Sequence, residues 1–374
     1  MKRMLMVASV PSMIGQFNMN NIKILQELGY QVDVACNFRD RSVWNNDRVQ
    51  AFIKELKAKK IKTYQIDFSR SSKNMLQHMK SYKQLDYLMK KRKYDFIHCH
   101  TPIAGAIARL VAHKNNIKVI YTAHGFHFFK GAPIKNWVLY YPIERLLARY
   151  TDILITINKE DYCRAKTFKA KKVEYVPGVG IDIEKFKNCK VDVEKKKEEL
   201  GIPSNAKVLL SVGELNKNKN HLLVIRALKK INRQDLYYLI CGKGIEEYNL
   251  KKKTKQLKLE DKVIFAGFRN DVREIYHIAD MFIFPSKREG LSVALMEAMA
   301  SGIPCIASNI RGNVDLINNK SYLFKLNNQE SVNNKIQQLL NKGCIQNILY
   351  MKNRISAFDV EGILMEMKKI YIDI

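Results

Sequence analysis

The sequence alternates short runs rich in β-branched and aromatic residues with longer amphipathic stretches, and it does so in two series. The first series of β-rich runs extends from RMLMVAS to VEYVP, and the second from KVLLSVG to IPCIAS. Such alternation predicts parallel sheets covered by helices, because two parallel strands need a crossover connection that is usually helical. We therefore expect an α/β protein made of two doubly wound, Rossmann-like domains.

The alternation is interrupted between residues 178 and 205. This segment is polar and rich in lysine, and Pro177 and Pro203 bound it, as is typical of a connection between domains. Two domains joined in this way are expected to face a cleft, the usual place for a ligand. The expected boundaries are an N-terminal domain at 1–180, a linker at 181–204, a C-terminal domain at 205–355 and a final helix at 356–374 that packs back toward the first domain.

The composition is that of a globular cytoplasmic protein. Hydrophobic residues make up 47% of the 374 residues and charged residues 27%, which excludes a disordered chain. The seven cysteines are scattered without a C-x-x-C pair, so we expect reduced thiols and neither a disulfide framework nor a zinc site. No apolar run approaches the roughly 20 residues that span a bilayer. The short apolar run near the amino terminus is expected to be a buried first strand and not a signal peptide.

The formal net charge of +29 is the strongest compositional constraint. It implies a partner with many negative charges, which could be nucleic acid, an anionic lipid surface or a phosphorylated substrate. A single lysine-rich run is often only a solvated helix face, so the inference depends on the total charge. No recognised nucleic-acid-binding module is present, which argues against nucleic acid.

Residues 125–150 interleave aromatic with basic side chains. Amphipathic segments of this kind settle at membrane interfaces, and this favours an anionic membrane surface as a partner. The alternative is a helix between the domains whose aromatic side chains are buried. The residues concerned are Phe126, Phe128, Phe129, Trp137, Tyr140 and Tyr141, with Lys130, Lys135, Arg145 and Arg149.

A lone carboxylate stands in the helical part of the stretch PSKREGLSVALMEAMASGIP. Glu297 is the one polar side chain between Val293 and Ala300, in a helix expected to be buried on nearly all sides, where an unpaired carboxylate is costly. The helix is expected to follow the strand DMFIFPS and the loop KREGLS and to end near Ser301. A helix start beyond the end of a parallel strand binds anions, and Gly290 allows a phosphate to approach the backbone closely.

The spacing of the acidic residues is compatible with a nucleotide. Backbone amides of Gly290, Leu291 and Ser292 would face a phosphate, and Glu297 lies on the order of 7 Å further along the helix axis. That separation suits a ribose next to a diphosphate, because one carboxylate can accept hydrogen bonds from both ribose hydroxyls. Glu289 in the loop could accept from hydroxyls of an attached sugar. The alternative is a helix-start acid plus one salt-bridged glutamate, and the spacing by itself is a weak signal.

The segment SKREGLSVALMEAMASGIPCIAS closely resembles the donor site of family-4 glycosyltransferases, which are retaining enzymes of the GT-B architecture. The match extends backward through VIFAGFRNDVREIYHIADMFIFPS, and ASVPSMIGQF, YTAHGFHF and SVGELNKNKNHLLVIRAL fit the same architecture. The resemblance covers nearly the whole chain. It is closest to bacterial enzymes that build capsular or exopolysaccharide repeat units, and it implies a GT-B fold with two Rossmann-like domains.

The resemblance implies roles for individual residues. Lys219 corresponds to the lysine that neutralises the diphosphate, His124 to the histidine beside the reacting sugar, and Gly15 to the glycine loop that closes over the phosphates. Glu297 corresponds to the ribose-binding glutamate and Glu289 to the donor-sugar glutamate. The implied catalytic residues are His124, Lys219 and Glu289. The implied nucleotide-sugar-binding residues are Gly15, Gly213, Lys219, Phe265, Gly267, Phe268, Glu289, Gly290, Leu291, Ser292 and Glu297.

One position departs from the family pattern. Many relatives carry an arginine after the glycine of SVG, where this chain has Glu214; either Lys217 supplies the second diphosphate cation or Glu214 turns away. His100 and His127 are expected on the acceptor side. His98 and His100 form an H-x-H pair that could bind a metal, but no third ligand is apparent.

The implied function is transfer of a hexose or N-acetylhexosamine, with retention, from a UDP-sugar to a polyprenyl-diphosphate-linked acceptor in capsular or extracellular polysaccharide synthesis. The enzyme is expected in the cytoplasm, on the inner face of the membrane. The chain has no D-x-D motif, so neither a metal nor another cofactor is expected. No acidic residue near AHGFHF is placed as a nucleophile, which favours a front-face reaction. The alternatives are a GT-B transferase with a soluble acceptor, a non-hydrolysing UDP-N-acetylglucosamine 2-epimerase and a basic nucleic-acid-binding protein.

Overall fold

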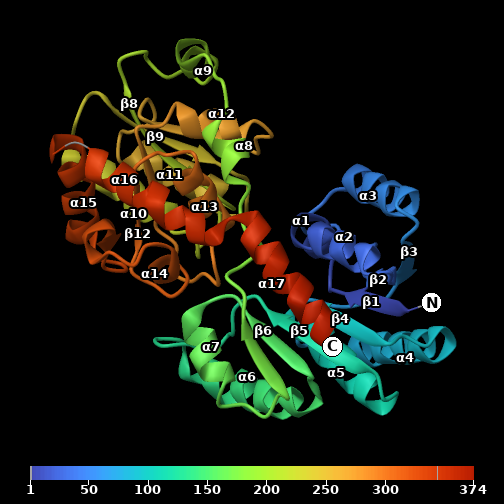
Figure 1. Cartoon of the computed structure of the whole chain (residues 1–374). Coiled ribbons are helices and arrows are strands. Elements are labelled where there is room, and N and C mark those ends of the chain that lie inside the picture. The colour runs from blue at the N-terminus through green and yellow to red at the C-terminus, as the bar shows by residue number, and fades with distance from the viewer. Residues whose placement is uncertain (1, 343) are drawn as a thin grey trace. The chain divides into compact units, whose positions relative to one another are not determined.

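The structure is a computed structural model that describes residues 2–342 and 344–374, and the chain divides into two compact units (Figure 1). Unit 1 contains the residues up to Val179 together with Gly362–Ile374, and unit 2 contains Gly180–Glu361. The chain therefore returns to unit 1 with its last helix, α17 (Val360–Asp373). No helix within the described residues has both the length and the apolar character needed to cross a membrane.

Unit 1 is built on a parallel sheet whose strand order reverses between β1 (Arg3–Val7) and β4 (Phe96–His100). The β-rich runs expected from RMLMVAS to VEYVP all form strands of this sheet. β4 is buried along its whole length, as expected for a central parallel strand with helices on both faces. The other strands are β3 (Lys62–Gln65) and β2 (Gln31–Cys36) beside β1, and β5 (Lys118–Ala123), β6 (Ile153–Thr156) and β7 (Lys172–Tyr175) beside β4.

Helices cover both faces of the unit 1 sheet. One core contains Ile14, Ile22 and Phe52 from the amino-terminal helices together with Met367 and Tyr371 of α17. The opposite core is covered by the helices that follow β3, β4 and β5. The helices are α1 (Pro11–Phe17), α2 (Met19–Glu27), α3 (Asn46–Ala58), α4 (Met75–Arg92), α5 (Pro102–Lys114), α6 (Ile134–Leu147), the 3-10 turn η1 (Ala148–Tyr150) and α7 (Lys159–Ala165).

Unit 2 has a second parallel sheet, in which the strand order reverses between β8 (Lys207–Val212) and β11 (Met281–Phe284). The runs expected from KVLLSVG to IPCIAS all form strands here, which confirms the α/β class with two doubly wound sheets. The edge strand β13 (Leu323–Phe324) was not expected, because two residues are too few for a periodic signal. The remaining strands are β9 (Leu236–Cys241), β10 (Val263–Gly267) and β12 (Cys305–Ser308).

The segment 181–204, expected as a linker, belongs to unit 2 in the structure. Ile181 and Phe186 are buried in the core of this unit, so two apolar side chains anchor an otherwise polar segment. The helices of unit 2 are α8 (Ile183–Lys187), α9 (Val193–Glu199), α10 (His221–Ile231), α11 (Glu247–Gln256), α12 (Val272–His277), α13 (Val293–Ala300), α14 (Asn313–Leu316), η2 (Lys320–Tyr322), α15 (Gln329–Lys342), α16 (Ile345–Ile355) and η3 (Ser356–Phe358).

Candidate functional site

The loops that follow β8 and β11 are joined to each other in unit 2, at the point where the strand order reverses. Ligands of doubly wound sheets bind at such a switch point, beyond the carboxyl ends of the strands. Lys219 Nζ in the first loop lies 2.7 Å from Glu289 Oε1 in the second, so the structure brings these two predicted residues together. Further hydrogen bonds join the loops, from Lys287 N–H to Asn218 O, from the Asn218 side chain to Arg288 O and from the Asn220 side chain to Pro285 O.

Lys219 is held in a confined position beside its partner. The side chains of Lys219 and Glu289 are 18% and 15% exposed, so both charges are partly shielded from water. Lys219 Nζ also lies 4.7 Å from the centre of the Phe284 ring, which is a cation–π distance. A Cβ on Gly213 would approach Lys219 Cε to 3.2 Å, so the glycine leaves room for the lysine stem. The switch point of unit 2 therefore holds one cation and one anion in direct contact.

The helix α13 begins directly after the second loop, where the sequence predicted a helix start. Ser292 is its N-cap, and Ser292 Oγ accepts a hydrogen bond from the amide of Leu295 at 3.3 Å. Gly290 packs against the loop that follows β12, because a Cβ on Gly312 would lie 2.3 Å from the Gly290 carbonyl oxygen. Sequence analysis missed Gly312, whose positive φ of 78° and close approach both require glycine.

Glu297 has a hydrogen-bond partner that the sequence did not reveal. The hydroxyl of Tyr276, in α12, donates to Glu297 Oε2 at 2.9 Å, and the Tyr276 side chain is fully buried. Burial raises the pKa of Glu297 above its usual value, against the opposing effects of the Tyr276 hydrogen bond and the charge of Lys185. A carboxylate can accept several hydrogen bonds, so Tyr276 orients Glu297 and leaves it capacity for a ligand.

The residues expected at the nucleobase lie at the end of the edge strand β10. Phe265 and Gly267 are in β10, whose pairing with β9 shifts register between them, and the Phe268 side chain is 70% exposed. The N–H of Gly242 donates to Gly267 O at 2.7 Å, and a Cβ on Gly242 would lie 1.9 Å from Gly213 O. Gly213 and Gly267 are therefore brought near each other through Gly242, another glycine that sequence analysis missed.

Glu214 and Lys217, at the departure from the family pattern, are both exposed to solvent. An exposed carboxylate is screened by water and salt, so Glu214 repels a nearby anion less than a buried carboxylate would. Lys219 is therefore the cation that the structure holds at Glu289.

Histidines of unit 1 gather at the carboxyl ends of β4 and β5. His100 Nδ1 lies 3.1 Å from His124 Nε2, and His100 Nε2 lies 3.2 Å from the Sδ of Met6. Burial lowers the pKa of His124 to about 4 and the pKa of His100 well below its usual value. Both rings are therefore neutral near pH 7, and a neutral ring donates through one nitrogen and accepts through the other.

His98 is a core residue whose two ring nitrogens both have hydrogen-bond partners. His98 Nδ1 lies 2.8 Å from the hydroxyl of Tyr371, and His98 Nε2 lies 2.8 Å from Thr122 Oγ1. Both ring nitrogens are thus engaged, and His98 ties α17 to the unit 1 sheet. In residues 2–342 and 344–374, no three His, Cys, Asp or Glu side chains are grouped so that they could hold a metal ion.

Gly15 and His127 have surroundings that the sequence did not predict. Gly15 lies inside α1, so the expected flexible glycine loop is wrong at this position. A Cβ on Gly15 would lie 2.4 Å from the Trp44 ring, and the glycine therefore permits close packing of that ring. The ring of His127 lies 4.7 Å from that of Tyr140, and the His127 carbonyl accepts a hydrogen bond from Asn136.

Most aromatic residues of the 125–150 segment pack on the core, which corrects the expectation that they enter a membrane; Phe129 is half-buried and is not part of that core. Phe126 and Phe128 are buried, with ring centres 4.8 Å apart. Trp137, Tyr140 and Tyr141 are partly buried and pack on the same core. These rings cover the unit 1 sheet because α6 turns its aromatic side inward, an orientation that composition alone does not reveal.

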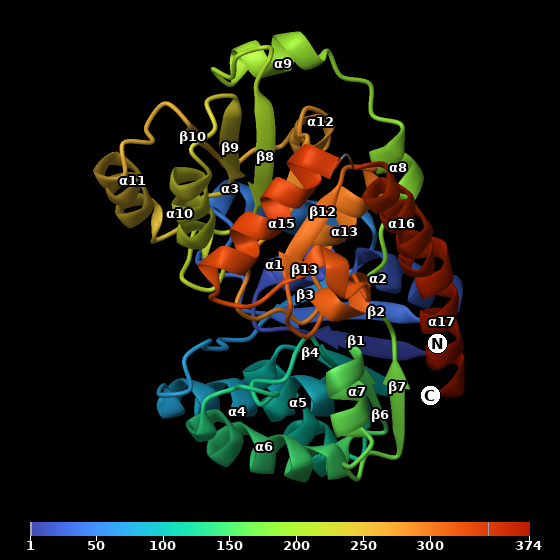
Figure 2. The same ribbon diagram turned by 90° about the vertical axis from the view of Figure 1, so that its left-hand side faces the viewer.

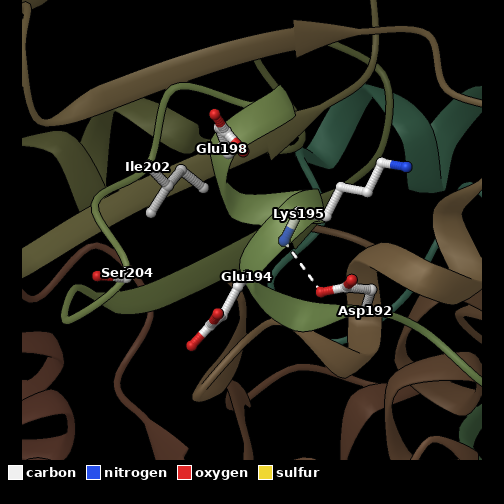
Figure 3. Close-up of a pocket in the computed structure, with 6 residues that line it drawn as sticks. All are labelled: Asp192, Glu194, Lys195, Glu198, Ile202 and Ser204. Atoms are coloured by element: carbon white, nitrogen blue, oxygen red, sulfur yellow. Dashed lines mark hydrogen bonds between the residues drawn. The ribbon is translucent and has the colours of Figure 1, made fainter.

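An open hollow of about 600 Å³ lies beside α9 in unit 2 (Figure 3). Its wall includes the N-cap of α9, where the amide of Lys195 donates to Asp192 Oδ1 at 3.1 Å. Three of the side chains that line it are carboxylates, which would repel a diphosphate, so this hollow is unsuited to a nucleotide sugar. The lining residues are Asp192, Glu194, Lys195, Glu198, Ile202 and Ser204.

Two doubly wound units of parallel sheet and helix are the architecture called GT-B, and solved structures agree with this fold. A crystal structure of Anabaena Alr3699/HepE in complex with UDP and glucose matches with a TM-score of 0.79 at 18% identity, over 100% of both chains. A sucrose-phosphate synthase from Thermosynechococcus elongatus matches with a TM-score of 0.78 at 19% identity, over 100% of this chain and 99% of that one. The fold is therefore GT-B.

Sequence comparison then gives the family. Residues 192–355 match the model of Glycosyl transferases group 1, and residues 14–158 match that of Glycosyl transferase 4-like. The chain is 33% identical to the putative glycosyltransferase EpsD of Bacillus subtilis (strain 168), over 99% of this chain and 96% of the relative. It is 30% identical to an Escherichia coli UDP-Gal:alpha-D-GlcNAc-diphosphoundecaprenol alpha-1,3-galactosyltransferase, over 80% and 81% of the two chains. The protein belongs to the group 1 glycosyltransferases, with a glycosyl transferase 4-like region in its first half, as its motifs implied.

Proposed function

We propose that this glycosyltransferase moves a hexose or N-acetylhexosamine from a UDP-sugar to a polyprenyl-diphosphate-linked acceptor, with retention at the anomeric carbon. The observation that carries this proposal is the 30% identity to the Escherichia coli enzyme, which is named for a UDP-sugar donor and a diphosphoundecaprenol-linked acceptor. A role in capsular or extracellular polysaccharide synthesis agrees with relatives named as O-antigen biosynthesis glycosyltransferases. The acceptor lipid would place the enzyme at the cytoplasmic face of a membrane.

The contact between Lys219 and Glu289 supports the donor half of this proposal. A bound diphosphate would compete with Glu289 for the ammonium, because it presents more negative charge. Glu289 would then accept hydrogen bonds from hydroxyls of the donor sugar. Amides at the capped start of α13 would meet the phosphate oxygens, and Glu297, oriented by Tyr276, would accept from the ribose.

The chemistry proposed for this site is stabilisation of the leaving group. The bond from the anomeric carbon to the phosphate oxygen breaks, and the acceptor oxygen bonds to the same face of that carbon. The acceptor proton passes to the leaving phosphate oxygen, so no protein nucleophile is needed. Lys219 and the amides of α13 offset the charge that develops on UDP. His124, neutral near pH 7, contributes hydrogen bonds to the reacting sugar.

The test is a transfer assay with a panel of UDP-sugars and a polyprenyl-diphosphate-linked N-acetylglucosamine. Because the chain has no D-x-D motif, we expect equal activity in EDTA and in added Mg²⁺, and an α-linked product by NMR. Activity lost in EDTA and restored by Mg²⁺ would contradict metal independence. Transfer to water-soluble acceptors alone would contradict the proposed lipid-linked acceptor. A β-linked product from an α-linked donor would contradict retention at the anomeric carbon.

We expect Glu297→Gln to weaken UDP binding about tenfold, or about 1.4 kcal/mol. The glutamine side chain keeps one oxygen that accepts a hydrogen bond from Tyr276, but it lacks the negative charge and the second acceptor oxygen that a ribose would use. Titration calorimetry measures the change, and Glu330→Gln, the same replacement at an exposed site of unit 2, is the matched control. An unchanged UDP affinity in folded Glu297→Gln would remove Glu297 from the site.

A further inference from the structure

The face of α6 that points away from the unit 1 sheet is apolar. The inner positions Glu144 and Leu147 are buried, whereas Ile134 and Val138 are 81% and 71% exposed. Leucine and isoleucine side chains gathered on one exposed helix face commonly mark an interaction surface. The exposed apolar residues of this surface, which we call the α6 outer face, are Ile134, Val138, Leu139, Pro142, Ile143 and Leu146.

The charged side chains beside these residues are basic. Lys135, Arg145 and Arg149 are all exposed. Glu144 is the one acidic residue of α6, and it faces inward, where its Oε2 lies 2.9 Å from Nη2 of the buried Arg109. The α6 outer face therefore combines apolar side chains with cations and carries no carboxylate.

The beginning of α4 presents a second exposed apolar patch in the same layer of helices. α5 packs against both α4 and α6, and Figure 2 shows the three helices on one side of the unit 1 sheet. The first turns of α4 expose Met75, Leu76 and Met79, and two lysines follow: Lys83, and Lys80, whose Nζ lies 2.7 Å from Asp67 Oδ2. Two helices of one layer thus present the same combination of apolar and basic side chains.

An anionic lipid surface matches this combination. Interfacial helices place apolar side chains at the acyl boundary and cations at the phosphate headgroups. A second copy of this chain is a poorer occupant, because a two-fold dimer through the α6 outer face would bring two sets of cations together with no carboxylate between them. Phe128 and Trp137, which sequence analysis expected at the membrane, lie on the inner side of this layer.

We propose that the α6 outer face, together with the first turns of α4, docks unit 1 on an anionic bilayer. This rests on the proposed function, since a polyprenyl-diphosphate-linked acceptor is held in a membrane. The apolar residues enter the interface, and Lys135, Arg145 and Arg149 meet the headgroups. Binding therefore has a part that salt screens and a part, due to apolar burial, that salt does not screen.

The first experiment is cosedimentation of the full chain with vesicles of phosphatidylglycerol and phosphatidylcholine in equal parts. Wild type should bind at low salt and retain a bound fraction at high salt, and it should not bind pure phosphatidylcholine at low protein concentration. The triple variant Val138→Ser, Leu139→Ser, Leu146→Ser should lose the salt-resistant fraction, with partitioning at least about tenfold weaker. The matched control replaces exposed apolar residues of unit 2: Ile245→Ser, Ile345→Ser, Leu349→Ser.

A second variant, Lys135→Glu, Arg145→Glu, Arg149→Glu, tests the charge without touching the apolar residues. It should abolish binding at low salt while UDP affinity stays at the wild-type value. Wild type that ignores the anionic vesicles, or a serine variant that binds them like wild type, overturns the proposal. It is also overturned if the serine variant changes the sedimentation coefficient of the free protein, since a second copy would then cover the face.

The outcomes separate this proposal from the proposed function. Vesicle binding that depends on the α6 outer face, without any transfer to a lipid-linked acceptor, would support the proposed docking surface and contradict the proposed lipid-linked acceptor. Transfer to the lipid-linked acceptor, with vesicle binding unaffected by either α6 variant, would support the proposed function and contradict the proposed docking surface.

Discussion

Replacement of Lys219 by alanine is expected to lower kcat/KM for glycosyl transfer by about 10²–10³-fold. The structure holds the Lys219 ammonium 2.7 Å from Glu289, in a position where little of either side chain is exposed. If the lysine is removed, the Glu289 carboxylate keeps its charge beside the site proposed for the diphosphate. The variant therefore loses an attraction to the leaving group and gains a repulsion, and both effects grow as negative charge develops in the transition state.

The control for this prediction is Lys230→Ala, which removes the same charge from an exposed position of unit 2. Steady-state kinetics and UDP titration should show no change in that variant, so a general effect of net charge is separated from the loss at the site. The double variant Lys219→Ala, Glu289→Gln should recover part of the UDP affinity, because the uncompensated carboxylate is gone. Wild-type kcat/KM in folded Lys219→Ala would exclude this lysine from catalysis.

The fold and much of the candidate site in unit 2 follow from patterns that are local in the sequence. Parallel strands buried on both faces are short apolar runs, and each of those expected here forms a strand. Gly290, Ser292 and the apolar run that follows them predict a loop and then a helix start, and in the structure Ser292 is the N-cap of α13. Glu297 is conspicuous because it is the one polar side chain in that run.

Other parts of the site depend on residues that are distant in the sequence. Tyr276 becomes the partner of Glu297 only because the fold brings its hydroxyl from α12 to α13, and Gly312 contacts Gly290 only because β12 lies beside β11. A glycine that permits close backbone approach has no local signature unless it stands in a motif. The direction in which α6 turns its aromatic side also depends on the sheet beneath it, so the sequence suggested that aromatic side chains of the segment 125–150 enter a membrane, whereas they pack on the core.

Glu144→Ala is expected to destabilise unit 1 by about 3–5 kcal/mol. The Arg109 side chain is fully buried, and its Nη2 lies 2.9 Å from Glu144 Oε2. Its Nε donates to Gly105 O at 3.1 Å, and its guanidinium lies 3.9 Å from the centre of the Tyr121 ring. Without Glu144 these contacts leave a buried guanidinium with no counter-charge, which costs far more than the loss of a surface ion pair.

Chemical denaturation followed by tryptophan fluorescence measures this effect in unit 1, because both tryptophans of the chain, Trp44 and Trp137, belong to that unit. Glu27→Ala is the matched control: it breaks the exposed pair with Lys23 and should cost no more than about 0.5 kcal/mol. The double variant Arg109→Met, Glu144→Leu should recover most of the stability, since apolar residues of similar size can replace a buried ion pair at little net cost. A loss in Glu144→Ala no larger than that in Glu27→Ala would show that water reaches Arg109 and compensates its charge, and the pair would then count as a surface contact.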